Sequence, residues 1–262
     1  MMKTDVEFIS QARDHTFIDS WYELTTSSHF WFQWRMLAAA HQLASMKLPL
    51  NKPLRALEVG CGTGVLREQF EAETDWIVDG CDLDHNALSR ATSGRGRILY
   101  YDVTDEFEQL KCAYDVIILF DVLEHIEKTR PFLESILKHL KPNGLFLVNV
   151  PALQSLYGKY DEAAGHVRRY KKDSLAKEFA DTNLEIEDMR YWGFSLVPVL
   201  LLRKLINKLM RHQSSDEIIK SGFRPPLEVV NKTFRTLMRV EAFLLKAPPL
   251  GSSLLMIGRK GS

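Results

Sequence analysis

The stretch Leu-Glu-Val-Gly-Cys-Gly-Thr-Gly, residues 57–64, decides the fold of this 262-residue chain. Its apolar start is typical of a short strand, and Gly60, Gly62 and Gly64 follow at alternate positions. Glycine carries no Cβ and readily adopts positive φ, so the backbone can turn sharply here and a ligand can lie directly against it. A strand that turns on glycines into a helix predicts a nucleotide-type site at the carboxyl edge of a parallel sheet.

The spacing of the glycines and the acid before them indicate the kind of ligand. Dinucleotide sites use Gly-x-Gly-x-x-Gly and direct a helix N-terminus at a pyrophosphate. Here the third glycine comes one residue earlier, and Glu58 precedes the loop. A carboxylate at this position would repel a phosphate but attract an ammonium group. The residues therefore favour a cofactor with an amino acid tail over NAD.

Acidic residues also end the next two apolar segments. Asp82 follows residues 77–81 and lies 18 residues beyond Gly64, close to the roughly 20-residue offset at which an acid binds ribose hydroxyls in such folds. Asp102 ends the segment after that. Each acid alone could be a helix N-cap. Because the carboxyl ends of neighbouring parallel strands meet at one crevice, we expect Glu58, Asp82 and Asp102 to converge there.

Two further apolar segments continue the pattern. Residues 114–120 read as a strand buried on both faces, and Asp121-Val-Leu-Glu-His-Ile follows them directly. Residues 140–144, Leu-Lys-Pro-Asn-Gly, then turn into another apolar run at residues 145–150. Together with the first three segments, these two form a series of five motifs in order over residues 54–151.

These five motifs resemble those of the class I S-adenosylmethionine-dependent methyltransferases. The resemblance is to the bacterial ubiquinone/menaquinone-type small-molecule and glycan-associated branch in particular. The resemblance implies an α/β fold with a doubly wound, mainly parallel seven-stranded sheet, its last strand antiparallel and helices on both faces. It also implies S-adenosyl-L-methionine as the cofactor, with Asp102 on the adenine amino group. The expected cofactor-binding residues are Arg35, Glu58, Gly60, Cys61, Gly62, Gly64, Asp82, Leu83, Asp102, Val103, Phe120, Asp121 and His125.

Residues 1–50 form an aromatic-rich segment that we expect to be helical from Arg35 to Met46. The rings can pack this helix onto the sheet. Alternatively, the segment closes over the cofactor, because a sulfonium cation favours aromatic faces and an arginine can bind a carboxylate bidentately. Trp31-Phe32-x-x-Arg35 resembles the entry segment of the same branch. Arg35 is therefore the candidate for the methionine carboxylate.

The loop after residue 151 carries Gly-His-x-Arg-Arg-Tyr, residues 165–170, which again resembles that branch. A loop at the carboxyl end of a strand faces the crevice, so its polar residues can reach the acceptor. Histidine titrates near neutral pH, and His166 is the candidate catalytic base. Arg168 and Arg169 can hold an acidic acceptor, or these groups can simply tie the loop to the domain. We expect His125 to shape the pocket.

An inserted helical cap is expected at residues 194–250, between the cofactor-binding core at 54–192 and the last strand at 253–260. About sixty residues here are too many for a hairpin loop. Two helices are expected, one near residues 202–211 and one near 227–246, with the loop 213–226 mobile. The first carries apolar residues at helical spacing, namely Leu202, Leu205, Ile206, Leu209 and Met210. Basic residues lie between them, namely Arg203, Lys204, Lys208 and Arg211. Such a helix suits an anionic membrane surface or a packing seam.

The length and composition suit one large domain or a domain with an insertion. The resemblance makes residues 1–262 a single methyltransferase domain, and the charge excludes some partners. Acidic and basic residues number 34 each, so the chain has no net positive charge to attract a nucleic acid. The three cysteines lack metal-ligand spacing, and we expect no metal. The N-terminus lacks a hydrophobic signal core, so we expect a cytoplasmic protein, with peripheral membrane association through the cap left open. The oligomeric state is also open.

The predicted function is transfer of a methyl group from S-adenosylmethionine to a small-molecule or lipid/glycan-associated acceptor, with a hydroxyl oxygen as the favoured acceptor atom. Within the same class, the alternative is a quinone-precursor methyltransferase. The alternatives outside it are a nicotinamide-dependent oxidoreductase, which the glycine spacing disfavours, and a non-catalytic cofactor-binding scaffold.

Overall fold

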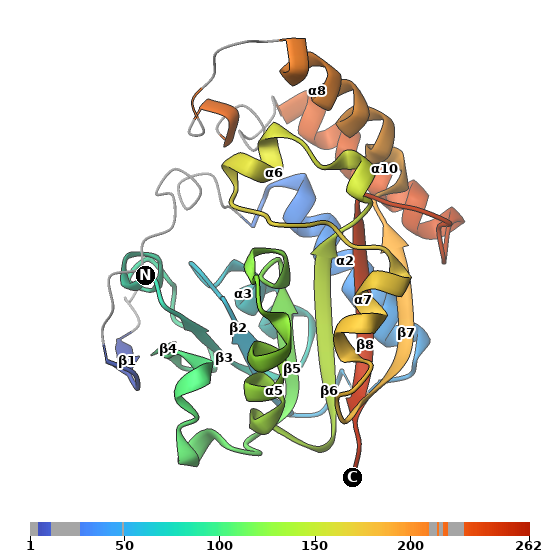
Figure 1. The fold of residues 1–262 in the computed structure, drawn as a ribbon. Coiled ribbons are helices and arrows are strands. Elements are labelled where there is room, and N and C mark those ends of the chain that lie inside the picture. The colour runs from blue at the N-terminus through green and yellow to red at the C-terminus, as the bar shows by residue number, and fades with distance from the viewer. Residues whose placement is uncertain (1–4, 12–26, 49, 210–213, 215–216, 220–227) are drawn as a thin grey trace.

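The chain folds around one eight-stranded sheet with helices against both faces (Figure 1). The computed structural model describes residues 5–11, 27–48, 50–209, 214, 217–219 and 228–262. The strands are β1 (Val6–Phe8), β2 (Arg55–Val59), β3 (Ile77–Asp82), β4 (Ile98–Tyr100), β5 (Tyr114–Phe120), β6 (Leu140–Pro151), β7 (Leu184–Trp192) and β8 (Ser253–Lys260). Their order across the sheet is β1-β4-β3-β2-β5-β6-β8-β7.

The strand directions confirm the predicted doubly wound fold. All paired strands are parallel except β8, which lies antiparallel between β6 and β7. The sheet has one strand more than the seven expected, because β1 pairs with β4 at the edge, with Val6 opposite Ile98. This strand has only three residues, and Glu7 and Phe8 are exposed. Such a short, exposed segment has no apolar pattern that would predict a strand.

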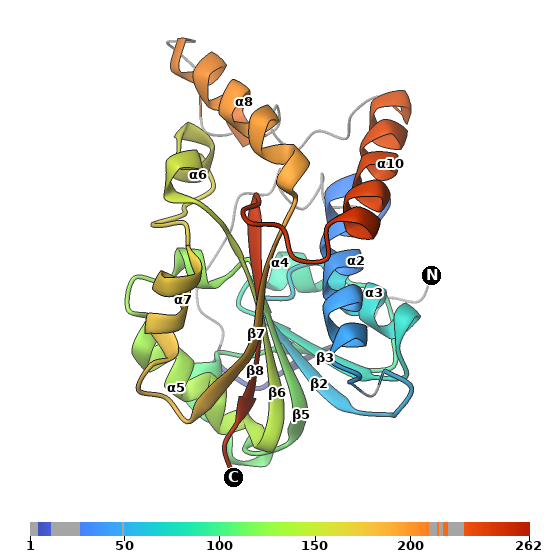
Figure 2. The same ribbon diagram turned by 90° about the vertical axis from the view of Figure 1, so that its right-hand side faces the viewer.

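Helices cover the two faces of the sheet in separate groups (Figure 2). α2 (Phe30–Ser45) and α3 (Val65–Glu73) lie on one face, and α5 (Thr129–His139) and α7 (Lys172–Phe179) lie on the other. The side chains of β5 alternate between the two cores: Val116 and Ile118 pack with α2 and α3, while Ile117 and Leu119 pack with α5 and α7. This arrangement explains why β5 is apolar from Val116 to its end.

Several helices begin or end at other residues than expected. α2 starts at Phe30 rather than Arg35, because the His29 side chain accepts a hydrogen bond from Trp31 N and caps it. The sequence predicts a helix at residues 85–92 with Asp84 as its N-cap. Asp84 does cap α4 (His85–Leu88), but the helix is shorter. The sequence predicts Asp173 as the N-cap of a helix at residues 174–181. This is wrong, because α7 begins at Lys172 and Asp173 lies in its first turn.

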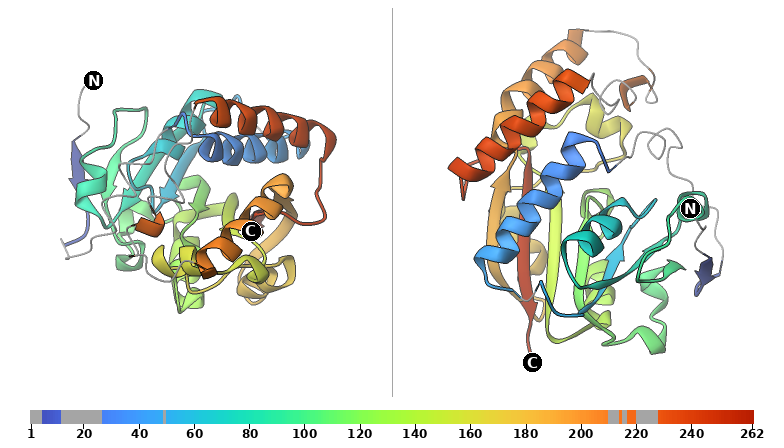
Figure 3. Two further views of the ribbon diagram at one scale, coloured as in Figure 1. Left: turned by 90° about the horizontal axis from the view of Figure 1, so that it is seen from above. Right: turned by 180° about the vertical axis from the view of Figure 1, so that it is seen from behind.

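The predicted cap contains α8 (Val197–Leu209) and α10 (Glu228–Leu244), which lie at the carboxyl edge of the sheet (Figure 1). Seen from above, α10 runs beside α2 (Figure 3), and the rings of Phe30 and Phe234 stack with centroids 4.6 Å apart. The Glu241 carboxylate accepts hydrogen bonds from Phe194 N and Ser195 N at 2.9 and 2.8 Å. It thereby fixes α10 to the start of the cap.

The apolar spacing in α10 predicts one buried face made of Leu227, Val230, Phe234, Leu237 and Leu244, and this prediction is only partly correct. Asn231, Met238 and Glu241 are the buried residues of this helix, whereas Leu237 and Leu244 are exposed. The expected face followed the apolar residues, but the structure buries two polar ones that make specific hydrogen bonds. Most of the loop expected to be mobile, residues 213–226, lies outside the described residues.

The apolar stripe of α8 faces outward in the described part of the chain. Leu202, Leu205 and Ile206 keep 59%, 55% and 46% of their surface exposed. The basic side chains turn the other way: the Arg203 guanidinium lies 4.4 Å from the Tyr160 ring centroid, and Lys204 Nζ donates to Ser155 O at 2.7 Å. These apolar residues of α8 therefore do not pack against the rest of the described domain. Among the helices that can be described, none combines the length and the apolar run needed to span a bilayer.

Candidate functional site

A cavity of about 770 Å³ lies between the carboxyl ends of the parallel strands and the cap. This volume is typical of small-molecule and cofactor sites. Its walls come from the loops after β2, β3, β4 and β5, from the segment after β6, and from α8 and α10. The sequence-predicted residues that line it are Gly60, Gly62, Asp82, Leu83, Asp102, Val103, Asp121, His125 and His166.

Five predicted residues, Arg35, Glu58, Cys61, Gly64 and Phe120, are not part of the cavity wall. Four of them are buried, namely Arg35, Glu58, Cys61 and Phe120. Gly64, with φ +77°, is the N-cap residue of α3. A contact between these residues and a ligand therefore remains a prediction.

The glycine loop takes the backbone conformation that its sequence predicts. Gly60 and Gly62 have φ of +75° and +53°, in the region that glycine favours. A Cβ on Gly60 would clash with Val122. Asp82 holds the loop in place, since its Oδ2 accepts from Gly62 N at 2.8 Å and its Oδ1 from Leu83 N at 2.7 Å. The loop thus presents bare backbone to the cavity.

Glu58 is buried, and the cost of burying its ionised carboxylate is only partly offset by neighbouring groups. Burial raises its pKa to about 8, although Arg35 and Arg67 act against the shift. No described group donates a hydrogen bond to its Oε2. A cationic group bound nearby would stabilise the ionised carboxylate. Glu58 therefore fits the predicted neighbourhood of an ammonium group.

Arg35 belongs to a series of hydrogen-bonded polar side chains that the sequence does not reveal. Its Nη1 contacts Asp121 Oδ2 at 2.5 Å, Asp121 Oδ1 accepts from Asn149 Nδ2 at 2.7 Å, and Asn149 Oδ1 accepts from Trp192 Nε1 at 2.8 Å. The guanidinium also lies 5.0 Å from the ring centroid of Trp31, which lines the cavity. Asp121 has φ +58°, an uncommon conformation that the chain holds at the end of β5.

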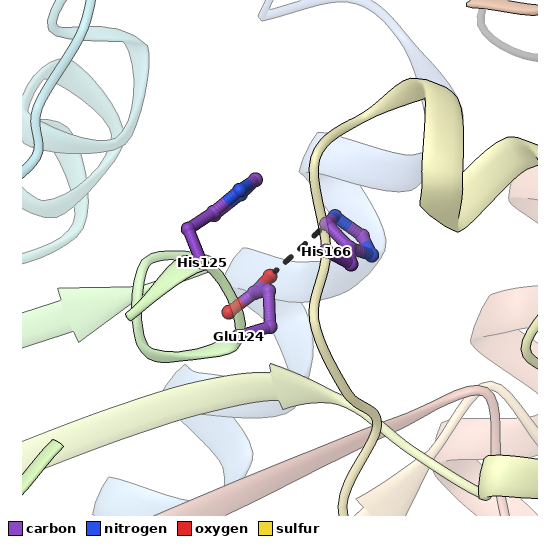
Figure 4. A group of neighbouring side chains, drawn as sticks. All are labelled: Glu124, His125 and His166. Carbon is purple, nitrogen blue, oxygen red and sulfur yellow. Dashed lines mark ion pairs between the residues drawn. The ribbon is translucent and has the colours of Figure 1, made fainter. Parts of the chain in front are cut away.

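A second group of polar side chains, Glu124, His125 and His166, also lines the cavity (Figure 4). Glu124 and His125 belong to the short helix η3 (Leu123–His125), and His166 belongs to the segment after α6 (Lys159–Ala163). His166 Nδ1 lies 2.9 Å from Asp161 Oδ1, and its Nε2 lies 3.9 Å from Glu124 Oε1. The two imidazole rings have centroids 4.8 Å apart. The structure thus brings two predicted residues together with two acids.

The ionisation of this group follows from burial and hydrogen bonding. Burial raises the pKa of Glu124 well above its usual value, and Asp121 adds to the shift. Burial together with the neighbouring His166 lowers the pKa of His125 to about 4. For Asp161, burial alone would raise the pKa, but hydrogen bonds from His166 and Arg169 lower it below its usual value. Asp161 is therefore the ionised partner of His166.

Glu124 and Asp161 were not among the predicted site residues. Glu124 could have been suspected, because it lies next to His125 directly after β5. Asp161 precedes His166 by five residues, and their contact depends on the fold of the intervening turn. Arg169 donates to Asp161 Oδ1 at 2.7 Å and to the backbone carbonyl of Ala152 at 3.2 Å. Arg169 therefore ties the loop to the domain, and it also lines the cavity.

Comparisons with known proteins agree with this geometry. The model of the family described as "Methyltransferase domain" matches residues 29–188. The ubiquinone biosynthesis O-methyltransferase of Schizosaccharomyces pombe mitochondria is 29% identical over 167 residues, 54% of this chain and 58% of that protein. The enzyme of the same name from Rickettsia typhi is 26% identical over 173 residues, 59% of this chain and 70% of that protein.

A solved structure with a similar fold is phosphoethanolamine N-methyltransferase 2 of Haemonchus contortus in complex with S-adenosyl-L-methionine. It has a TM-score of 0.53 and 18% identity, and the match covers 84% of this chain and 52% of that one. The chain belongs to the methyltransferase domain family. The predictions of a class I methyltransferase and of S-adenosylmethionine as its cofactor are thereby confirmed.

Proposed function

We propose that this protein transfers the methyl group of S-adenosylmethionine to a hydroxyl oxygen of a small amphipathic acceptor, of which a quinone precursor is one candidate. The observation that carries the proposal is the His166–Asp161 pair, which faces the same cavity as the glycine loop. The similarity to two enzymes named O-methyltransferases supports oxygen as the acceptor atom.

The cofactor end of the cavity suits S-adenosylmethionine. Gly60 and Gly62 leave room beside the backbone, Asp82 and Asp102 offer carboxylate oxygens for the ribose and adenine groups, and Glu58 would stabilise the ammonium end. The bound cofactor supplies an electrophilic methyl group on a sulfonium ion. The protein holds the acceptor in line with that group in a site that excludes water, which can contribute about 7 to 11 kcal/mol.

His166 is placed to move a proton. Asp161 accepts from its Nδ1–H, which leaves Nε2 on the side of Glu124 and the cavity. A carboxylate in this position selects the tautomer and orients the ring. An unactivated hydroxyl needs such a base to become a good nucleophile.

Two measurements test the proposed function. Calorimetry should show binding of S-adenosylhomocysteine and no binding of NADH. Incubation with methyl-labelled S-adenosylmethionine and a fractionated cell extract should then place label in an acceptor as an alkali-stable ether, with no label on the protein itself. Cofactor binding without any labelled acceptor would favour the scaffold interpretation.

Asp82→Ala should weaken the binding of S-adenosylmethionine by about 1 to 3 kcal/mol, the scale of a hydrogen bond to a charged group. The side chain both lines the cavity and holds the Gly62 backbone. Calorimetry measures the change, and Asp173→Ala, an exposed acid in the first turn of α7, is the control. Unchanged affinity in a folded Asp82→Ala protein would remove Asp82 from the cofactor site.

The cap is proposed to admit a lipid-associated acceptor from a membrane surface and to set acceptor choice. Leu196, Val199 and Leu200 line the cavity, while Leu202 and Leu205 on the same segment are exposed. An exposed apolar stripe that continues into an apolar cavity wall would give an acceptor with a long apolar tail a continuous path.

Replacing both Leu202 and Leu205 with Gln should reduce sedimentation of the protein with anionic vesicles. Their apolar surface, which would enter the lipid, is the cause of the expected loss. Arg203→Gln would not test membrane binding, because this side chain packs on the Tyr160 ring. If wild type and the double variant both stay in the supernatant at low salt, the acceptor is a soluble molecule and the membrane proposal is wrong.

A further inference from the structure

The acidic and basic side chains that line the cavity come from different parts of the fold. The acids belong to the loops after β3, β4 and β5, namely Asp82, Asp84, Asp102, Asp121 and Glu124. Among the described lining residues the arginines are Arg169, from the segment after α6, and Arg203, from α8, and no lysine joins them. S-adenosylmethionine carries a sulfonium and an ammonium group, which the acids suit. The arginines suit a group of the opposite charge, which the acceptor would have to supply.

The first turns of the cap present one face to the cavity. Leu196, Val199, Leu200 and Arg203 line it, at the spacing i, i+3, i+4 and i+7 that places residues on one side of a helix. The first three are apolar, and Arg203 is the charged member at the end of the row. A molecule that lies along this face therefore meets apolar surface and then one guanidinium.

Arg203 is held against an aromatic ring of the cavity wall. Its guanidinium lies 4.4 Å from the ring centroid of Tyr160, a distance at which a cation is attracted to the ring face. The N–H donors of a guanidinium form a planar fork that matches a carboxylate or a phosphate. Tyr160 is followed in α6 by Asp161, which bonds to His166 Nδ1. Neighbouring residues of one helix thus position Arg203 and His166 in the same part of the cavity.

The arginines of the Gly-His-x-Arg-Arg-Tyr segment suit an anion less well than Arg203 does. Arg168 is not among the residues that line the cavity. Arg169 lines it, but its charge is offset by Asp161, whose Oδ1 lies 2.7 Å from Arg169 Nε. Burial lowers the pKa of Arg203, and the charge of Arg169 acts in the same direction. A bound anion would stabilise the charged form of Arg203.

We infer that the methyl acceptor carries a carboxylate or phosphate group, which Arg203 binds while the acceptor hydroxyl lies at His166. The inference rests on the proposed function and narrows its substrate class to a hydroxylated amphipathic acid. The apolar body of this acid would lie along Leu196, Val199 and Leu200. A neutral molecule of the same shape would leave the guanidinium without an anion, so the site should discriminate against it.

The test measures the binding of three probes with the same apolar tail: octanoate, octyl phosphate and the neutral octanamide. Each is titrated by calorimetry into the full chain saturated with S-adenosylhomocysteine, at neutral pH and low salt. Wild type should bind at least one of the two anions about 10 to 100-fold more tightly than octanamide, the scale of hydrogen bonds to a charged group. The anion that binds more tightly shows whether the acceptor group is a carboxylate or a phosphate.

Variants of Arg203 assign the preference to this residue. Arg203→Gln should bind the anions no more tightly than octanamide, with its affinity for octanamide unchanged. Arg203→Lys keeps the charge without the planar fork and should keep part of the preference. Lys204→Gln is the matched control, because Lys204 is the next residue of α8, donates to Ser155 O and is not part of the cavity wall. It should bind all three probes as wild type does.

A purely structural role of Arg203 would change the affinity for all three probes alike. Circular dichroism and S-adenosylhomocysteine binding establish that each variant is folded. Equal affinity of wild type for the three probes, or no binding of either anion, would overturn the inference. An anion preference that persists in folded Arg203→Gln would overturn it as well.

The outcome separates this inference from the proposed function. If the acceptor labelled in the extract is uncharged and Arg203→Gln methylates it with the wild-type KM, the anion site is wrong and the proposed function stands. If the anion preference depends on Arg203 but no hydroxyl oxygen is methylated, the anion site stands and the proposed function is wrong.

Discussion

Gly62→Val is expected to abolish measurable binding of S-adenosylmethionine while the domain stays folded. Gly62 has φ +53°, where a β-branched side chain is strained. It also lines the cavity beside Asp82, so a valine side chain would extend into the space proposed for the cofactor. The sheet and its two cores do not depend on a side chain at this position. Binding should therefore suffer far more than folding.

Calorimetry with S-adenosylhomocysteine and thermal unfolding of the same samples measure the two effects separately. Thr63→Val is the matched control, since it adds no bulk and lies in the same loop. Gly62→Ala should give an intermediate loss. A folded Gly62→Val protein with wild-type affinity would mean that the cofactor does not lie against this loop.

The glycine loop and the acids after β2, β3 and β4 could be predicted because their positions depend on local sequence and on one topological rule. Parallel strands place their carboxyl ends at the same edge, so Glu58, Asp82 and Asp102 converge once the strands are recognised. The antiparallel last strand followed from the resemblance to class I methyltransferases. These features need no knowledge of side-chain packing.

The remaining features depend on contacts between distant segments. Arg35 pairs with Asp121, 86 residues away, and no local pattern predicts that pairing. α10 buries Asn231 and Glu241 because they bond to Phe30 N and to the start of the cap. A prediction from apolar periodicity alone chooses the wrong residues there. The short edge strand β1 is missed for the same reason, since its partner β4 stabilises it.

The surroundings of His166 could be predicted only in part. His166 was predicted from the Gly-His-x-Arg-Arg-Tyr resemblance, but its partners were not. Asp161 reaches it through the turn after α6, and Glu124 reaches it from the loop after β5. Only the fold shows that the histidine is held between two buried acids, and this arrangement makes it a candidate for chemistry.

His166→Ala should lower turnover by about 10² to 10⁴-fold, the usual contribution of a positioned base. Affinity for S-adenosylhomocysteine should stay nearly unchanged, because the groups proposed for the cofactor lie at the other strand ends. His41→Ala, at an exposed position of α2, should behave as wild type. Steady-state kinetics with the identified acceptor give the change in kcat separately from the change in KM.

Asp161→Asn refines the interpretation of this result. It keeps the shape of the side chain but weakens the support of His166 Nδ1, so kcat should fall less than in His166→Ala while KM changes little. Added imidazole should restore part of the His166→Ala activity if the ring acts on the acceptor proton. Wild-type kcat in a folded His166→Ala protein would instead reduce the residue to a support for the loop. The rate would then come from positioning of the acceptor alone, and an acceptor hydroxyl that is already acidic would be required.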